Sequence, residues 1–187
     1  MKTYKITLML LAGLLLGLLN QRPQMANAAS KNKILIIYFS MSGTTKTAAK
    51  QIQKYTGADI VRLHRAEPYP KGYDNYAQVA DRERRNNIHP AIRQNIPDLS
   101  QYDTVMIGFP TWWQQPPMVI HTLFDDYDFQ GKTIIPFTTS MSTPMKASMP
   151  YMRQMAQADG ATIKNGFRYD GNNQQLRKFL KHNGLLK

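Results

Sequence analysis

Five strand-like runs, each followed by a stretch with helical character, constrain the fold of this chain more than any other feature. The strongest runs are continuously apolar and rich in isoleucine, which is typical of strands that are buried on both faces. Glycine or proline stands at most of the helix ends. The alternation predicts an α/β fold, in which a doubly wound, five-stranded parallel sheet has helices on both faces.

The expected strands are residues 33–40, 59–64, 104–109, 133–138 and 161–169. The expected helices are residues 44–55, 73–86, 117–127, 144–159 and 172–182. Right-handed crossovers place the carboxyl ends of all these strands at one edge of the sheet. Ligands of such sheets bind outside that edge, where the strand order reverses, so we expect the functional residues in the loops after the strands.

The first 28 residues do not share this pattern. Lys2 and Lys5 precede an apolar run of 14 residues, which is short for a membrane span, and Ala-Asn-Ala at residues 26–28 fits a cleavage site. We expect residues 1–28 to be a secretory signal and residues 29–187 to be one folded domain. The domain is then exported to the periplasm, the cell envelope or the medium, without a stable membrane span. An uncleaved anchor is the alternative.

Composition narrows the classes of function. The chain has no cysteine, which excludes disulfides, thiolate nucleophiles and sulfur ligands for metals. Without the three basic residues of the first 28, the chain keeps 21 basic and 12 acidic residues, a net charge of +9. This charge predicts attraction to anionic envelope polymers or lipid headgroups. No nucleic-acid-binding signature is present, and we expect the Arg82, Arg84 and Arg85 trio to be a solvated helix end.

Ser-Met-Ser-Gly-Thr-Thr, at residues 40–45, joins the first run to the first helix. The free backbone N–H groups of a first helical turn and the helix dipole favour an anion there. Serine and threonine hydroxyls add neutral donors, and Gly43 lets the backbone come close. We therefore expect one phosphate monoester, held without lysine or arginine. Walker and dinucleotide loops need further glycines. A strand-to-helix turn with a threonine N-cap is the alternative.

Two further loops reach the same edge of the predicted sheet. Gly-Phe-Pro-Thr-Trp-Trp, from residue 108, places both tryptophans of the chain side by side. Exposed tryptophans need a partner, so we expect one to fold back on the protein and the other to meet a planar aromatic ligand. Residues 136–145 form a loop of small polar residues that could meet the polar rim of a ring. An ordinary flexible loop is the alternative for this segment.

The three loops together resemble the flavodoxin family. The carrying motifs are the [ST]-x-[ST]-G-x-T loop, Glu-Pro-Tyr-Pro from residue 67, Gly-Phe-Pro-Thr-Trp-Trp, and the segment at residues 128–140. The resemblance covers residues 33–168 and implies sheet order 2-1-3-4-5. It also implies that FMN is bound where the strand order reverses, as in flavodoxin itself. It also implies the contacts of the cofactor. Its phosphate would be held by Ser40, Met41, Ser42, Gly43, Thr44 and Thr45. One flavin face would meet Pro110, Thr111, Trp112 and Trp113, and the pyrimidine side would meet Thr139, Ser140, Met141 and Ser142.

Three functions remain open. An electron carrier is favoured, because adjacent tryptophans would cover a flavin face. Its partner would be a redox protein or a small-molecule electron acceptor. An NAD(P)H-dependent quinone or flavin reductase on the same fold is the first alternative, and an envelope-binding protein with an empty FMN site is the second. We expect no metal site, because His64, His89, His121 and His182 are scattered. Asp125, Asp126 and Asp128 are expected on a solvated face away from the flavin.

Overall fold

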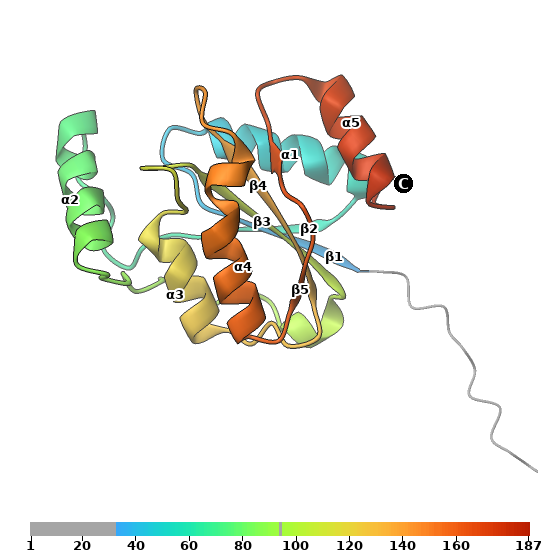
Figure 1. Cartoon of the computed structure of the whole chain (residues 1–187), viewed down its shortest axis with the longest axis horizontal. Coiled ribbons are helices and arrows are strands. Elements are labelled where there is room, and N and C mark those ends of the chain that lie inside the picture. The colour runs from blue at the N-terminus through green and yellow to red at the C-terminus, as the bar shows by residue number, and fades with distance from the viewer. Residues whose placement is uncertain (1–32, 94) are drawn as a thin grey trace, which may run out of the picture. The chain divides into compact units, whose positions relative to one another are not determined.

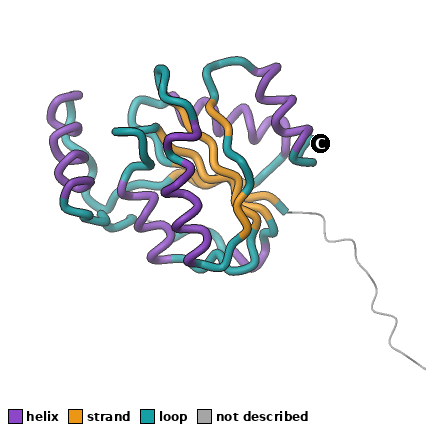
Figure 2. Tube along the Cα trace, viewed as in Figure 1, coloured by secondary structure: helices purple, strands orange, loops and turns teal. Residues whose placement is uncertain are grey.

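The computed structural model of the chain describes residues 33–93 and 95–187. The segment expected to be a secretory signal, residues 1–28, lies outside the described residues. Within them, strands and helices alternate as predicted (Figures 1 and 2). The strands are β1 Ile34–Tyr38, β2 Asp59–Arg62, β3 Thr104–Pro110, β4 Thr133–Thr139, β5 Thr162–Ile163 and β6 Phe167–Arg168. The helices are α1 Thr44–Thr56, α2 Tyr73–Arg85, α3 Met118–Asp126, α4 Met149–Ala158 and α5 Asn173–His182, with short 3-10 turns at Leu99–Gln101 and Met145–Ala147.

The sheet is parallel, with the order β2-β1-β3-β4-β5, and β6 also pairs with β4. The expected order 2-1-3-4-5 is therefore confirmed. From β1 the chain first adds β2 on one side and then crosses to add β3 on the other side, so the order reverses between β1 and β3. The loops that follow these two strands flank the position where ligands of doubly wound sheets bind.

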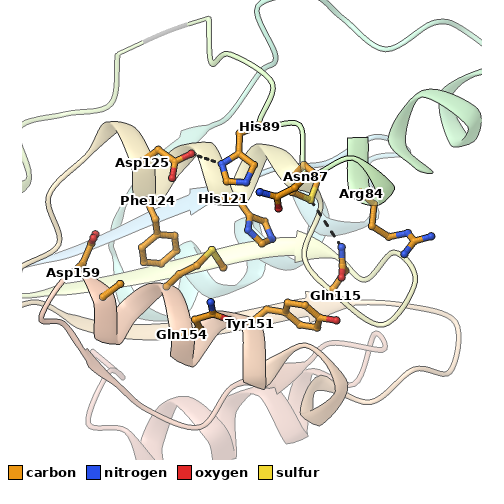
Figure 3. Close-up of a pocket in the computed structure, with 13 residues that line it drawn as sticks. Arg84, Asn87, His89, Gln115, His121, Phe124, Asp125, Tyr151, Gln154 and Asp159 are labelled. Atoms are coloured by element: carbon orange, nitrogen blue, oxygen red, sulfur yellow. Dashed lines mark hydrogen bonds and ion pairs between the residues drawn. The ribbon is translucent and has the colours of Figure 1, made fainter. Parts of the chain in front are cut away.

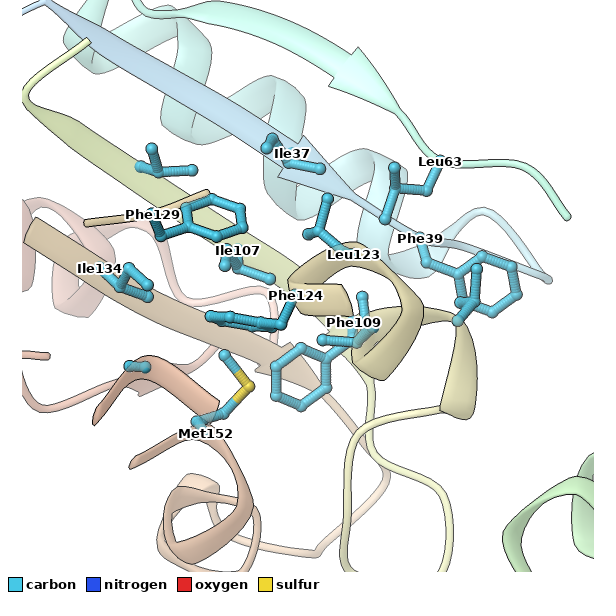
Figure 4. Packing of buried hydrophobic residues seen from close by; sticks show 14 of the residues in the cluster. Ile37, Phe39, Leu63, Ile107, Phe109, Leu123, Phe124, Phe129, Ile134 and Met152 are labelled. Carbon is cyan, nitrogen blue, oxygen red and sulfur yellow. The ribbon is translucent and has the colours of Figure 1, made fainter. Parts of the chain in front are cut away.

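The helices cover both faces of the sheet. Ile36 of β1 packs in a cluster with Ile52 of α1 and Leu176 of α5. Ile37, the next residue, faces the opposite cluster, which contains residues of α3 and α4 (Figure 4). Both isoleucines are fully buried. This two-sided burial explains why β1 is apolar at every position instead of alternating.

The predicted helix 144–159 is wrong in one respect, because it is broken. A 3-10 turn, Met145–Ala147, precedes α4, which starts only at Met149. Pro150 stands at the first turn of α4, where its missing N–H costs nothing, whereas farther inside a helix it would remove a hydrogen bond. Ser148 at the junction is buried and donates a hydrogen bond to the carbonyl of Gln114 (3.3 Å), which ties α4 to the loop after β3.

The predicted strand 161–169 is also interrupted, into β5 and β6. The gap lies opposite Pro136 in the middle of β4, which has no N–H to donate to a neighbouring strand. Gly166 passes very close to this position, since a Cβ atom added there would lie 2.7 Å from the Pro136 carbonyl oxygen. A glycine is required for this approach, and the two short strands form on either side of it.

Candidate functional site

Three loops meet at the carboxyl edge of the sheet, as the sequence predicts. The hydroxyl of Thr45, after β1, lies 2.8 Å from the hydroxyl of Thr139 at the end of β4. The backbone N–H of Thr111, after β3, donates to the Thr139 carbonyl (3.0 Å). The Thr111 hydroxyl also contacts that of Thr138 at 2.6 Å. Hydroxyl pairs therefore join all three predicted segments into one site.

The loop after β1, residues 40–45, is shaped for an anion. Gly43 is the N-cap of α1 and has φ 93°, in the left-handed region that favours glycine. The N-cap residue is therefore a glycine, so the expected alternative of a threonine N-cap is wrong. The Ser40 hydroxyl accepts the N–H groups of Gly43 (3.1 Å) and Lys46 (3.3 Å). Within the described part of the chain, no hydrogen bond occupies the N–H of Thr44 or Thr45. Two donors are therefore available at the positive end of the helix dipole.

The four hydroxyls of this loop have different surroundings. Those of Ser42 and Thr44 are exposed and lie 3.1 Å apart. Ser40 and Thr45 are buried, and the Thr45 hydroxyl contacts Thr139 between two loops. Ser42 and Thr44 are therefore the hydroxyls most open to a ligand. The side chain of Met41 packs against the hydrophobic cluster on the α3 and α4 face.

Basic side chains surround this loop, which the sequence did not predict. Lys46, Lys50 and Arg168 line the same hollow as Ser42, Gly43 and Thr44. The Arg168 guanidinium donates to the Ser140 carbonyl (3.2 Å) and to Asp170 (3.3 Å). The expectation that no lysine or arginine is needed is therefore incomplete. Arg168 is far from the loop in sequence, and only the pairing of β6 with β4 brings it near.

The loop after β3 contains an unusual turn. Trp112 and Gln115 exchange two backbone hydrogen bonds of 3.0 Å, and the two residues between them, Trp113 and Gln114, have φ 45° and 66°. Positive φ at both central positions defines a type I′-like turn, which normally uses glycine, asparagine or aspartate. A tryptophan and a glutamine there store strain of about 1–3 kcal/mol each. Such strain is found at ligand-binding sites more than elsewhere in proteins.

The two tryptophans have opposite surroundings. Trp112 lies in an aromatic cage: Phe39 and Tyr69 meet it edge-on, each at 5.7 Å between ring centres, and Tyr76 of α2 stacks on it at 5.9 Å. Trp113 is 47% exposed, and its one charged neighbour in ring contact is the guanidinium of Arg84 at 5.5 Å, among the described residues. One tryptophan is thus folded back on the protein, and Trp113 keeps a free face.

A buried ion pair supports this cage. Glu83 of α2 is 2% exposed, accepts a hydrogen bond from the Tyr69 hydroxyl (2.6 Å) and pairs with Arg65 (2.7 Å). Burial raises the pKa of Glu83, although Tyr69 and Arg65 act in the opposite direction. Burial and the nearby Glu83 also raise the pKa of Tyr69. Sequence analysis missed this group, because a glutamate in a polar helix gives no sign that it is buried.

The loop after β4 is mostly open to solvent. Met141 is fully exposed, whereas the Ser140 hydroxyl donates to the Thr143 carbonyl (2.6 Å) and closes the loop on itself. Ser142 is exposed beside Met141. Methionine is a flexible apolar side chain, so this part of the loop has an adaptable apolar surface.

A model of the flavodoxin family matches residues 33–182, almost all of the described chain. The chain belongs to the flavodoxin family. This flavodoxin-family protein is similar to a flavoprotein from Bacteroides uniformis ATCC 8492, with 29% identity and a TM-score of 0.73 over 80% of this chain and 98% of that chain. It is also similar to a flavoprotein from Lactobacillus acidophilus NCFM that was solved in complex with FMN, with 26% identity and a TM-score of 0.65 over 79% of this chain and 97% of that chain. No curated protein sequence matches it significantly.

A second pocket of this flavodoxin-family protein borders the loop after β3, whose residue Gln115 lines it (Figure 3). It has a volume of about 480 Å³ and is lined by residues of α3 and α4, with His121 and Asp125 among them, and by His89 from the segment after α2. His89 pairs with Asp125, and the two imidazole rings lie 5.3 Å apart between centres. The prediction that the histidines are scattered is therefore wrong for His89 and His121. Asp125 is not simply a solvated acid, because it is paired with His89. Burial and the neighbouring His89 lower the pKa of His121 to about 4.

Two features are absent from residues 33–93 and 95–187. No group of three or more histidine, cysteine, aspartate or glutamate side chains is arranged to hold a metal ion. No helix in this part has both the length and the apolar character needed to cross a bilayer.

Proposed function

We propose that this flavodoxin-family protein binds FMN at the carboxyl edge of its sheet and transfers electrons outside the cytoplasm. One observation carries the cofactor assignment. The loop at residues 40–45 presents unpaired backbone donors and two open hydroxyls at a helix N-terminus, which is what a phosphate monoester requires. Family membership and the FMN complex of the Lactobacillus acidophilus flavoprotein support the same cofactor.

Each loop has a task in this proposal. The phosphate would be held by the N–H groups of Thr44 and Thr45 and by the Ser42 and Thr44 hydroxyls, with Lys46 and Arg168 nearby to balance its charge. The flavin ring would extend toward the loops after β3 and β4, where Trp113 and Met141 have free surfaces. FMN supplies the redox chemistry, while the chain binds it, orients it and sets its electrostatic surroundings.

A carrier is favoured over a reductase for one structural reason. The strained turn at Trp113 and Gln114 and the cage around Trp112 hold the loop after β3 in one conformation, so that its aromatic surface would cover a flavin face. An NAD(P)H-dependent reductase needs that face open for nicotinamide or quinone. A covered ring can still exchange single electrons with a partner at its exposed edge.

Action outside the cytoplasm is part of the proposal and rests on the signal-like residues 1–28. Cell fractionation with N-terminal sequencing tests it. A mature chain that begins near Ala29 outside the cytoplasm is expected, and a full-length cytosolic chain would contradict export.

The cofactor and the activity are tested together on purified protein. We expect yellow protein from which acid releases FMN, and which reduces an external electron acceptor after chemical reduction. We expect NADH and NADPH oxidation, with or without a quinone, to stay at the level of free FMN. Rapid NAD(P)H turnover would instead establish the reductase, and protein that stays colourless with added FMN would reject both redox functions.

A further inference from the structure

Acidic residues of the described chain gather at the edge of the sheet opposite the flavin site. Seven of the twelve lie at the amino edge, at the start of a strand, in the segment that leads into one or at the end of a helix: Asp59, Asp98, Asp103, Asp125, Asp126, Asp128 and Asp159. Five of these seven line two adjoining hollows at that edge. Two of them, Asp125 and Asp126, lie at the carboxyl end of α3, where a negative charge is unfavourable to the helix dipole. Helix stability therefore does not explain their position.

Basic residues surround the flavin site itself. Lys46 and Lys50 are exposed, lie one turn apart on α1 and share a face of that helix. Together with Arg168 they line one hollow. Among the described residues that line this hollow, Asp170 is the only acidic one, and it is paired with Arg168. Arg62 donates a hydrogen bond to the Ser40 carbonyl (2.6 Å) from the other side of the phosphate loop. The hollow at the cofactor edge therefore has an excess of basic side chains, whereas at the amino edge the acidic residues lie among lysines such as Lys33 and Lys132.

We propose that the cofactor edge docks an acidic patch on a protein redox partner. This inference rests on the proposed function, since electrons must leave or enter where the flavin comes closest to the surface. A bound phosphate offsets part of the local charge, but Lys50 lies a full turn beyond the phosphate loop. An acidic partner would be steered to this edge and kept from the acidic edge, which orients it for electron exchange.

A protein partner fits the observations better than a continuous anionic surface. Lys46, Lys50 and Arg168 line the opening of the cofactor site, so a polymer or membrane bound to them would cover the edge through which electrons pass. A compact acidic partner that carries its own redox centre would instead bring that centre to the opening.

Two forms of cytochrome c provide a matched pair of probes. The native protein is basic, whereas succinylation of its lysines makes the same haem protein acidic. In each reaction one electron leaves the reduced flavodoxin-family protein and converts ferric haem into ferrous haem. We expect the succinylated form to react about tenfold faster at low salt, with the difference lost at high salt. Equal rates, or a faster reaction with the basic form, would overturn the inference.

Charge-reversal variants locate the docking edge. Lys46→Glu with Lys50→Glu should slow the reaction of succinylated cytochrome c about tenfold, when rates are expressed per bound flavin. Lys54→Glu with Lys132→Glu makes the same change in net charge at the amino edge, and should alter the rate less than twofold. Equal effects of the two pairs would show that only the net charge matters and would contradict a docking edge.

Two further measurements separate the other outcomes. Salt-dependent association of the apoprotein with succinylated cytochrome c, followed by calorimetry, does not need the cofactor, so docking can be judged even if FMN binding fails. Vesicles that contain anionic phosphatidylglycerol test the alternative of a lipid surface. Association with vesicles but not with succinylated cytochrome c would replace the protein partner with a membrane surface.

Discussion

Trp112 and Trp113 are adjacent in sequence, yet they should contribute to different properties. Trp113→Ala removes the exposed ring, so we expect the emission of bound FMN to rise and its affinity to fall about tenfold, since a stacked aromatic pair contributes about 0.5–1.5 kcal/mol beyond its buried area. Trp112→Ala empties the aromatic cage and should lower the free energy of unfolding by about 2–4 kcal/mol. Fluorescence titration with FMN and urea unfolding of both variants measure these effects.

The result that would contradict this division is specific. If Trp112→Ala raises flavin emission and Trp113→Ala leaves emission and affinity unchanged, the ring lies on the cage side of the loop. If neither change affects emission, neither tryptophan covers the flavin, and the open face of a reductase becomes the better interpretation.

His121 should make the fold sensitive to acid. Burial lowers its pKa in the folded state to about 4, whereas an unfolded histidine titrates near 6.5. The unfolded state therefore binds more protons between these values, and stability is complete above pH ~6.5 and falls as the pH drops toward ~4. One pKa unit corresponds to about 1.4 kcal/mol of stability. Because the His121 side chain is partly exposed, we expect the free energy of unfolding to fall by only about 1–2 kcal/mol, less than the full pKa shift would give.

Unfolding by urea across this pH range tests the role of His121. His121→Gln should flatten the slope between pH 6.5 and 4, and His182→Gln on the exposed side of α5 is the matched control. Burial also lowers the pKa of His64, so a smaller slope should remain in both variants. An unchanged slope in His121→Gln would show that this histidine is protonated without cost in the folded protein.

At the scale of elements, the turn between β3 and α3 is the place where local sequence and structure disagree. Gln114 has φ 66° and is exposed, so Gln114→Gly should relieve strain and raise the free energy of unfolding by about 1 kcal/mol. Gln157→Gly, on the exposed face of α4, should lower it by a similar amount, because glycine weakens a helix. Thermal unfolding of both variants gives the comparison, and destabilisation by Gln114→Gly would contradict strain in this turn.

Hydrophobic patterning predicted the type and order of the main elements, because buried parallel strands and their crossover helices leave strong local signals. It did not predict where the pattern breaks. Pro150 starts α4 late, and Pro136 on one strand interrupts pairing on its neighbour near Gly166. The second effect depends on which strands are neighbours, and a single proline within an apolar run does not reveal that.

At the scale of the whole molecule, only those parts of the candidate site whose residues are close together in the sequence could be predicted. The loop at residues 40–45 carries its own signal, since a glycine among hydroxyls directly before a helix favours an anion site. Arg168 beside the phosphate loop, Glu83 beneath Trp112 and the His89–His121 pair come together through folding. Their positions follow from the sheet order and the helix packing, so the spacing of residues in the sequence does not predict them.

The proposed binding of the phosphate by the loop at residues 40–45 can be tested by removing a single hydroxyl oxygen. Ser42→Ala should weaken FMN binding about tenfold or more, through loss of one hydroxyl at a charged group. The Ser42 hydroxyl also contacts that of Thr44, so Ser42→Thr, which keeps the hydroxyl, is the matched control and should stay close to the parent. Riboflavin affinity should change little in either variant, and equal losses for FMN and riboflavin would place the phosphate elsewhere.

The most direct measurement is the ratio of the FMN and riboflavin affinities of the unaltered protein. The two molecules share the ring and the ribityl chain and differ only in the phosphate. At least two charged hydrogen bonds from the loop at residues 40–45, each worth about 1.5–3 kcal/mol, predict that FMN binds about a hundredfold more tightly or better. Equal affinities, or no binding of FMN, would contradict a phosphate site at the N-terminus of α1.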